Sequence, residues 1–416
     1  MNSGPPLICL IAAGHVASTP RLVKEADALT EAGYRVHVVF ARSFPAADPL
    51  DSAVLRAARW SHSRVDASRG PGAAARKLLG RLARLRVGWA RHPSLNAAAR
   101  ANGTEALHLG AVAARICAAL YIGHSLPALS AAALAARLRG SAFGFDLEDY
   151  HDEETDEAMS DRIEQTIRRT LQSRLLAGCA HLTASSPLIT RRYRDSYGVH
   201  PRTILNVFPR SFAPSAAVDP GPISHERPAR VYWFSQTIGP GRGLDEVVTA
   251  LGRMRSPVEL HLRGFPAPGF LDHLRARAAQ AKLLRPLRIL PPGAPGEMAR
   301  LASDAHLGLS TELRLPPNRD LCLTNKIFVY LLAGIPQLLS RTSAQAALAP
   351  ELGEAALLAD LDQAEAVAAQ LDILFSAPDR MAAARRHATE LAERRFCWDI
   401  EKAAFLDSVG RVVPLP

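Results

Sequence analysis

Short apolar strands alternate with amphipathic helices along this 416-residue chain, and the alternation occurs twice. In the first half, residues 7–13 predict a strand, and residues 20–33 predict a helix whose apolar face carries Leu22, Ala26 and Leu29. Strands followed by helices at this spacing are typical of parallel, doubly wound sheets. The chain is therefore expected to be an α/β protein with two Rossmann-like sheets.

A proline-rich segment separates the two halves. Residues 207–228 contain five prolines and few periodic apolar positions, which is typical of a linker. We predict a first domain over 1–207, a linker over 208–228, a second domain over 229–396, and a terminal helix and tail over 397–416. Ligands of open parallel sheets bind beyond the carboxyl ends of the strands, so we expect the two domains to face each other across a cleft.

Composition narrows the class of protein. A hydrophobic fraction of 48% is enough for two cores and argues against a disordered chain. The five cysteines are dispersed without metal-ligand spacing, as expected for reduced thiols in the cytoplasm. The start lacks a basic signal region, and no run of about 20 apolar residues is free of charge. We therefore expect a cytoplasmic location without a membrane-spanning helix.

The net charge of +10 is concentrated in one segment. No acidic residue lies between Asp66 and Glu105, and residues 69–91 predict a helix with five large apolar side chains and several cations. This pattern favours a peripheral helix on an anionic membrane surface at the inner face of the membrane. The alternative is an ordinary amphipathic helix packed on its own domain. Nothing resembles a nucleic-acid recognition motif, so no nucleic acid is expected.

In the second half, the stretch TNKIFVYLLAGIPQLLS predicts a helix with a polar start. Thr324 or Asn325 is a natural N-cap, and the free N–H groups of the first turn favour an anion. Lys326 places a cation where the helix dipole disfavours one, which a bound phosphate would explain. The alternative is a solvated lysine. Gly334 is expected to end the helix in a left-handed conformation.

A glycine-rich loop at residues 238–243 follows a predicted strand in the same half. Gly241 lets backbone approach a ligand, and Arg242 can reach a phosphate. A plain turn is the alternative. Together with Lys326, the loop supplies cations suited to the diphosphate of a nucleotide-sugar.

In the first half, acidic residues follow the strand FGFDL. Carboxylates at the carboxyl edge of a strand can act as a base or bind hydroxyl groups. A charged surface loop is the alternative, and the spacing is poor evidence for a metal, so no metal is expected. The candidates for catalysis are Asp146, Glu148, Asp149 and His151. The residues expected to point at the same edge from neighbouring loops are Gly14, His15, Arg21 and His124.

These features, in this order, resemble a GT-B glycosyltransferase of the retaining group called family 4. The resemblance rests on GHVASTPRLVKEADALTEAGYRVHVV, the DLEDYH strand end, GRGLDEVVTAL, NKIFVYLLAGIP and the terminal FCWDIEKAAFL. It implies two Rossmann-like domains, a last helix that crosses back to the first domain, an acceptor site in the first domain and a donor site in the second. The donor-site residues would be Arg242, Gly241, Lys326, Asn325, Glu312 and Thr324.

The resemblance also implies an activity. A hexosyltransferase of this kind moves a sugar from a nucleotide-sugar, UDP- or GDP-linked, to a glycan, lipid-linked or small-molecule acceptor, with retention and without a bound metal or other cofactor. Its family serves bacterial polysaccharide and related pathways.

The chain departs from the family at two positions. The family carries two glutamates eight positions apart, and the matching positions here are Leu321 and Val329. Glu312 and Asp320 are also eight positions apart, but they do not align with the positions of the family's glutamates relative to the predicted helix. An alternative is therefore a degenerate GT-B protein that binds a sugar or partner without catalysis. A sugar-nucleotide epimerase has no firm signature here.

Overall fold

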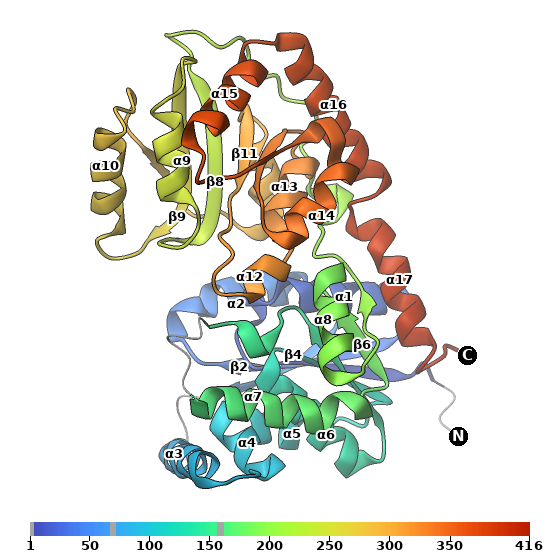
Figure 1. Cartoon of the computed structure of the whole chain (residues 1–416). Helices are drawn as coiled ribbons and strands as arrows, with labels where there is room; N and C mark the ends of the chain where they lie inside the picture. The colour runs from blue at the N-terminus through green and yellow to red at the C-terminus, as the bar shows by residue number, and fades with distance from the viewer. Residues whose placement is uncertain (1–3, 67–71, 156–161) are drawn as a thin grey trace. The chain divides into compact units, whose positions relative to one another are not determined.

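The computed structural model describes residues 4–66, 72–155 and 162–416. These residues form two compact units: unit 1 is Met1–Ile204 with Lys402–Pro416, and unit 2 is Leu205–Glu401. Each unit contains one sheet, and every strand pair described is parallel. The α/β class with two doubly wound sheets, predicted from the alternating pattern, is confirmed (Figure 1).

Unit 1 has a seven-stranded sheet. In spatial order its strands are β3 (Ser61–Asp66), β2 (Arg35–Arg42), β1 (Leu7–Ala12), β4 (Leu120–His124), β5 (Ala142–Leu147), β6 (His181–Ala184) and β7 (Arg202–Thr203). Its helices are α1 (Pro20–Glu31), α2 (Asp48–Ala57), α3 (Ala73–Trp89), α4 (Leu95–Asn102), α5 (Ala106–Ala113), α6 (Leu126–Arg139), α7 (Arg162–Leu175) and α8 (Pro187–Tyr197).

The core of unit 1 follows the alternation of strand side chains. Cys9 and Ile11 of β1 pack with Tyr121 of β4 against the alanine-rich α6, whose small side chains allow close approach. The α1 residues Leu22, Ala26 and Leu29 are fully buried, as the helical spacing predicted.

Unit 2 has a six-stranded sheet. Its strands in spatial order are β10 (Arg288–Leu290), β9 (Val258–Pro266), β8 (Ala229–Ile238), β11 (Leu307–Ser310), β12 (Gln337–Ser340) and β13 (Ala356–Ala359). Its helices are α9 (Leu244–Leu251), α10 (Phe270–Gln280), α11 (Met298–Ala302), α12 (Asn318–Leu321), α13 (Asn325–Leu332), α14 (Ser343–Leu352), α15 (Ala364–Phe375) and α16 (Pro378–Arg394).

Helices cover both faces of this second sheet. Val231 and Trp233 of β8 belong to the core cluster that includes α9 and α15. The alternate residues Tyr232 and Phe234 meet the ring of Tyr330 from α13. Helix α13 therefore lies on the sheet face opposite α9, with its first turn following the loop after β11.

The last helix, α17 (Trp398–Gly410), begins in unit 2 and continues into unit 1 from Lys402. Within unit 1, the ring of Phe405 packs edge-on against His181 of β6, and Ser408 hydrogen-bonds the same imidazole. The predicted return of the terminal helix to the first domain is confirmed. Residues 208–228, predicted as a linker, fall within unit 2 and contain only one short 3-10 turn, Arg210–Phe212.

Candidate functional site

The carboxyl ends of β8 and β11 place a short glycine-rich loop beside the start of α13 in unit 2. Arg242 lies in this loop between Gly241 and Gly243, which both have left-handed backbones with φ of +71° and +70°. The Arg242 side chain is half-buried. Within residues that the structure describes, no hydrogen bond or ion pair engages its guanidinium.

Gly243 explains why this loop reaches the end of β11. A Cβ added at Gly243 would lie 2.1 Å from the backbone oxygen of Thr311, so no other residue fits without displacement. The Thr311 hydroxyl donates a 3.1 Å hydrogen bond to the Arg242 carbonyl oxygen. The loop after β8 is thereby fixed against the residue that follows β11.

Arg319, which the sequence analysis missed, lies beside this loop. Its guanidinium donates to the carbonyl oxygens of Gly241, at 2.5 Å, and Leu315, at 3.0 Å. Burial and the neighbouring charge of Arg242 lower the pKa of Arg319, so the two guanidinium groups are close enough to repel. A negative ligand between them would relieve that repulsion. In the sequence, Arg319 is one of two arginines between β11 and α13, and no pattern distinguishes it from Arg314.

Lys326 differs from both sequence expectations, because it is neither solvated nor free to meet a ligand. Its ammonium is buried and pairs with the Glu312 carboxylate at 2.5 Å, and it lies 5.6 Å above the Trp233 ring. The second oxygen of Glu312 accepts a 2.9 Å hydrogen bond from Gln345. Glu312, predicted to face the donor, thus has both oxygens occupied by protein groups.

The start of α13 retains one unsatisfied group. Thr324 is the N-cap, as predicted, but its side chain makes no capping bond. Its hydroxyl oxygen is buried and has no hydrogen-bond partner among the residues described. Asn325 begins the helix and is half-buried, and Gly334 has the expected left-handed conformation with φ of +66°.

Leu321 and Val329 occupy the positions where the resembling family has glutamates. Both side chains are buried, Leu321 at the end of α12 and Val329 within α13. Neither position offers a carboxylate to a ribose hydroxyl. Recognition of a donor in unit 2 would therefore depend on Arg242, Arg319 and the first turn of α13.

In unit 1, three of the predicted residues form one buried ionic cluster. The Arg21 guanidinium pairs with Asp146 at 2.6 Å and donates 2.8 Å to the Ile204 carbonyl oxygen. The His124 ring lies between two carboxylates, with Nε2 3.2 Å from Glu25 and Nδ1 3.5 Å from Asp146. All four ionisable side chains are buried, so they hold α1, β4 and β5 together rather than facing a substrate.

The cluster shifts the pKa values of its members. Burial alone would lower the pKa of His124, but the Glu25 and Asp146 carboxylates outweigh burial and raise it to about 9. Burial would raise the pKa of Asp146, yet Arg21 and His124 hold it well below its ordinary value. His124 is therefore an imidazolium that bridges two carboxylates at neutral pH. Asp146, predicted as catalytic, is buried and pairs with Arg21 and His124.

Glu148 has the environment of an acid–base residue. Glu148 is exposed to solvent. Protein atoms near its carboxylate, then the Asp149 and Asp146 carboxylates, raise the pKa of Glu148 to about 7. Lys24 of α1, which the sequence analysis missed, is buried and interacts electrostatically with Glu148. Burial and Arg21 lower the pKa of Lys24 to about 7. In the sequence, Lys24 follows Arg21 by three residues, which places both on one helix face and could have indicated that they lie together.

The other two predicted catalytic residues lie close by. Asp149 is half-buried in the loop after β5. His151 is buried, and its Nδ1 lies 2.6 Å from the Glu154 carboxylate, which raises the His151 pKa against the effect of burial. The buried ring of His151 stabilises the loop and does not present a nitrogen to solvent.

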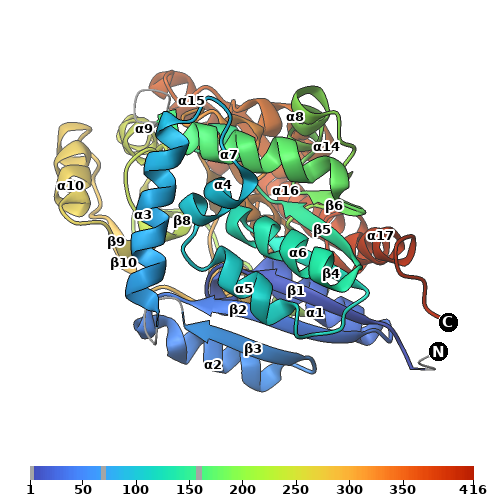
Figure 2. The same cartoon turned by 90° about the horizontal axis from the view of Figure 1, so that it is seen from below.

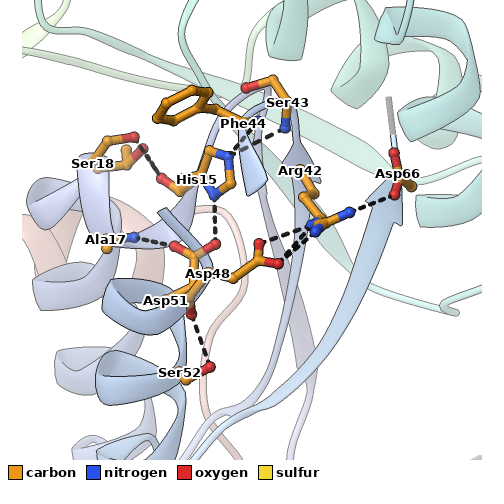
Figure 3. Close-up of polar contacts among 11 residues, drawn as sticks. His15, Ala17, Ser18, Arg42, Ser43, Phe44, Asp48, Asp51, Ser52 and Asp66 are labelled. Atoms are coloured by element: carbon orange, nitrogen blue, oxygen red, sulfur yellow. Dashed lines mark hydrogen bonds and ion pairs between the residues drawn. The ribbon is translucent and has the colours of Figure 1, made fainter. Parts of the chain in front are cut away.

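His15, which follows Gly14 in the loop after β1, lies in a separate cluster (Figure 3). The backbone N–H groups of Ser43 and Phe44 donate to its Nε2, at 3.2 and 2.9 Å. Because N–H groups only donate, Nε2 accepts, and Nδ1 carries the proton toward Asp51 at 2.6 Å. His15 therefore joins the loops after β1 and β2 as a neutral imidazole.

Two groups in unit 1 bring a histidine and two carboxylates within metal-binding reach: His15 with Asp48 and Asp51, and His124 with Glu25 and Asp146. In the first group the ring nitrogens are hydrogen-bonded and Asp48 pairs with Arg42. In the second, the Arg21 guanidinium already neutralises the carboxylates. In both groups protein cations or hydrogen-bond donors already pair with carboxylates.

Comparison with solved structures identifies the fold. The chain has the GT-B fold: 98% of it matches all of HepE from Anabaena, solved with UDP and glucose, at a TM-score of 0.72 and 14% identity. The sucrose-phosphate synthase of Thermosynechococcus elongatus matches 98% of the chain over 99% of its own length, at a TM-score of 0.70 and 13% identity.

A third similar structure is the lipopolysaccharide outer core galactosyltransferase WaaB. It matches 97% of the chain over 99% of its own length, with a TM-score of 0.62 and 12% identity. No protein-family model and no curated protein sequence matches the chain. Similarity at these identities defines the fold.

Proposed function

We propose that this chain is a glycosyltransferase that takes a hexose from a nucleotide-sugar. The observation that carries the proposal is Arg242, a half-buried cation without a hydrogen-bonded or ion-paired partner among the described residues, held beside Arg319 and the end of β11. Two convergent guanidinium groups suit a diphosphate, because arginine binds phosphate oxygens through paired hydrogen bonds. HepE, whose fold is the same, is described with UDP and with UDP-glucose, which supports a UDP-linked donor.

In this proposal unit 2 binds the donor and stabilises the leaving diphosphate. Arg242 and Arg319 would meet the negative charge that grows as the bond to the sugar breaks. The Thr324 hydroxyl and the N–H groups at the start of α13 would bind a phosphate oxygen. Lys326 and Glu312 would act indirectly, by fixing that helix start.

Unit 1 would bind the acceptor near the carboxyl end of β5. Glu148, whose pKa of about 7 suits proton transfer near neutral pH, is the residue that we assign to orient or deprotonate the acceptor hydroxyl, with Asp149 beside it. The acceptor would be a glycan, a lipid-linked sugar or a small molecule, reached from the cytoplasm. Retention of configuration, as in family 4, and a reaction without a metal ion complete the proposal.

The release of nucleoside diphosphate from a panel of nucleotide-sugars tests this proposal. We expect one donor, UDP-linked or GDP-linked, to be turned over, and Arg242→Ala to reduce kcat/KM by about 10²–10³. Arg275→Ala, which removes an exposed arginine of α10, is the matched control and should leave turnover unchanged. Full activity in Arg242→Ala would refute the donor site.

A catalytically degenerate GT-B protein is the second candidate. It is favoured by the buried, apolar Leu321 and Val329, and by the occupied carboxylate of Glu312. A loss of one carboxylate hydrogen bond to a ribose weakens binding by roughly one or two decades without abolishing it. Nucleotide binding without release of nucleoside diphosphate from any sugar donor would select this candidate.

A further inference from the structure

Helix α3 (Ala73–Trp89) presents its small side chains to the protein and its large ones to solvent. Gly80, Ala83 and Val87 are its buried residues, and they face the neighbouring helices α4 and α7. Figure 2 shows α3 at the margin of unit 1, alongside α4. This orientation reverses the usual one, in which leucines of a surface helix face the core.

The outward side of α3 carries a continuous apolar stripe. Its members are Leu78, Leu82, Leu85 and Trp89, which are 58%, 46%, 58% and 91% exposed. At 100° per residue these four side chains fall within an arc of about 60°, opposite the buried residues. The stripe is about 16 Å long. The alternative that this helix simply packs its apolar face on its own domain is therefore wrong.

Cations border the stripe. Lys77 and Arg81 lie on one flank and Arg86 on the other, and all three are exposed. No acidic residue occurs in the sequence from 67 to 104. Arg69, the first cation predicted for this segment, lies outside the described residues.

Positive charge continues past the end of the helix. Arg91 lines a cavity of about 560 Å³ in unit 1 together with Arg169 and Arg174 of α7. Asp152 is the one carboxylate among the described residues that line this cavity. The surface beyond the stripe therefore also favours negatively charged groups.

We propose that the stripe docks unit 1 on an anionic lipid bilayer. The leucines would enter the boundary between headgroups and acyl chains, Trp89 would lie at the headgroup level, and Lys77, Arg81 and Arg86 would reach lipid phosphates. A second copy of the chain is a poor occupant, because pairing two stripes would bring their bordering cations together. Within the described residues no helix has the length and apolar character to cross a bilayer, so docking would be peripheral.

This docking does not depend on the donor site of the proposed function, and a test without nucleotide separates the two. Trp89 is a direct probe, because Trp60, Trp233 and Trp398 are buried. With the full chain, vesicles containing phosphatidylglycerol should shift tryptophan emission to shorter wavelength and carry the protein in flotation. Vesicles of phosphatidylcholine alone should do so much less. In Trp89→Phe the emission shift should disappear while flotation remains.

Matched variants separate the apolar and ionic contributions. Leu82→Ala should weaken partitioning about tenfold, whereas Leu138→Ala, at a still more exposed leucine of α6, should not change it. Arg81→Gln should weaken it about fivefold, and Arg137→Gln on α6 should not. The proposal is overturned if vesicles fail to bind the wild type, if Leu82→Ala floats as well as the wild type, or if the stripe variants change oligomeric state but not vesicle binding.

Discussion

The pairing of Lys326 with Glu312 accounts for a lysine at the first turn of a helix. The dipole of α13 disfavours that cation, and the sequence suggested that a phosphate offsets the cost. In the structure the Glu312 carboxylate, which is buried together with Lys326, offsets that cost instead of a phosphate. The sequence could not show it, because the loop that carries Glu312 has no periodic pattern that fixes its side-chain directions.

We expect Lys326→Ala to reduce the free energy of unfolding by about 3–5 kcal/mol, because it leaves a buried carboxylate unpaired. Calorimetric unfolding of the full chain measures this loss. The double variant Lys326→Met with Glu312→Gln removes both charges and should recover much of the stability. A loss below about 1 kcal/mol in Lys326→Ala would show that the pair is not buried as described.

The imidazolium of His124 makes stability depend on pH. Its pKa in the folded chain is about 9, above the ordinary value of 6.5, so protonation stabilises the fold. The contribution is complete below about pH 6.5 and is lost as the pH rises through 9, up to roughly 3 kcal/mol.

The melting temperature of the wild type, compared with His124→Gln between pH 6 and 10, measures this contribution. The difference between the two proteins should be largest near pH 6 and should shrink toward pH 10. A difference that stays constant over this range would contradict a bridging imidazolium.

Glu148 has a raised pKa, of about 7. If it exchanges a proton with the acceptor, Glu148→Gln should lower kcat by about 10²-fold and remove the inflection of the pH–rate profile near pH 7. Asp195→Asn on the exposed side of α8 serves as the control and should leave the profile unchanged. An unaltered profile in Glu148→Gln would assign proton transfer elsewhere.

The conformation of the loop between β8 and α9 depends on Gly243. Gly243→Ala would force a Cβ against Thr311 with a left-handed backbone, which should cost about 2–4 kcal/mol and displace Arg242. Gly239→Ala is the matched control, because its nearest contact would be an ordinary 3.6 Å. Nucleotide affinity and melting temperature should fall only in Gly243→Ala, and equal behaviour of the two variants would contradict the fixed loop.

The elements that the sequence predicted are those with strong apolar runs, such as β1 and β8. The strands that it missed, β3, β7 and β13, all lie at sheet edges. β3 has one buried residue, Val65, and β7 has only two residues. Edge strands bury less surface, so their sequences need less apolar character and carry a weaker signal.

At the scale of the whole molecule, the sequence predicted the fold better than the contacts within the site. Arg21 and Asp146 were both predicted near one edge, but their ion pair joins residues 125 positions apart. Arg319 and Gly241 are 78 positions apart, and the arginine was not recognised. Periodicity specifies which face of an element is buried, whereas such pairings depend on how loops of different elements meet.

The proposed function requires that unit 2 binds a nucleoside diphosphate through Arg242. The most direct test is a thermal-shift titration of the full chain with UDP, GDP, TDP, ADP and CMP, with and without magnesium, on the wild type, Arg242→Ala and the control Arg275→Ala. A nucleotide at 100 times its dissociation constant should add about 2.7 kcal/mol to the stability of the protein that binds it. We predict a shift with one nucleoside diphosphate in the wild type and Arg275→Ala and its loss in Arg242→Ala. No shift with any nucleotide, or an undiminished shift in Arg242→Ala, would contradict nucleotide binding through Arg242.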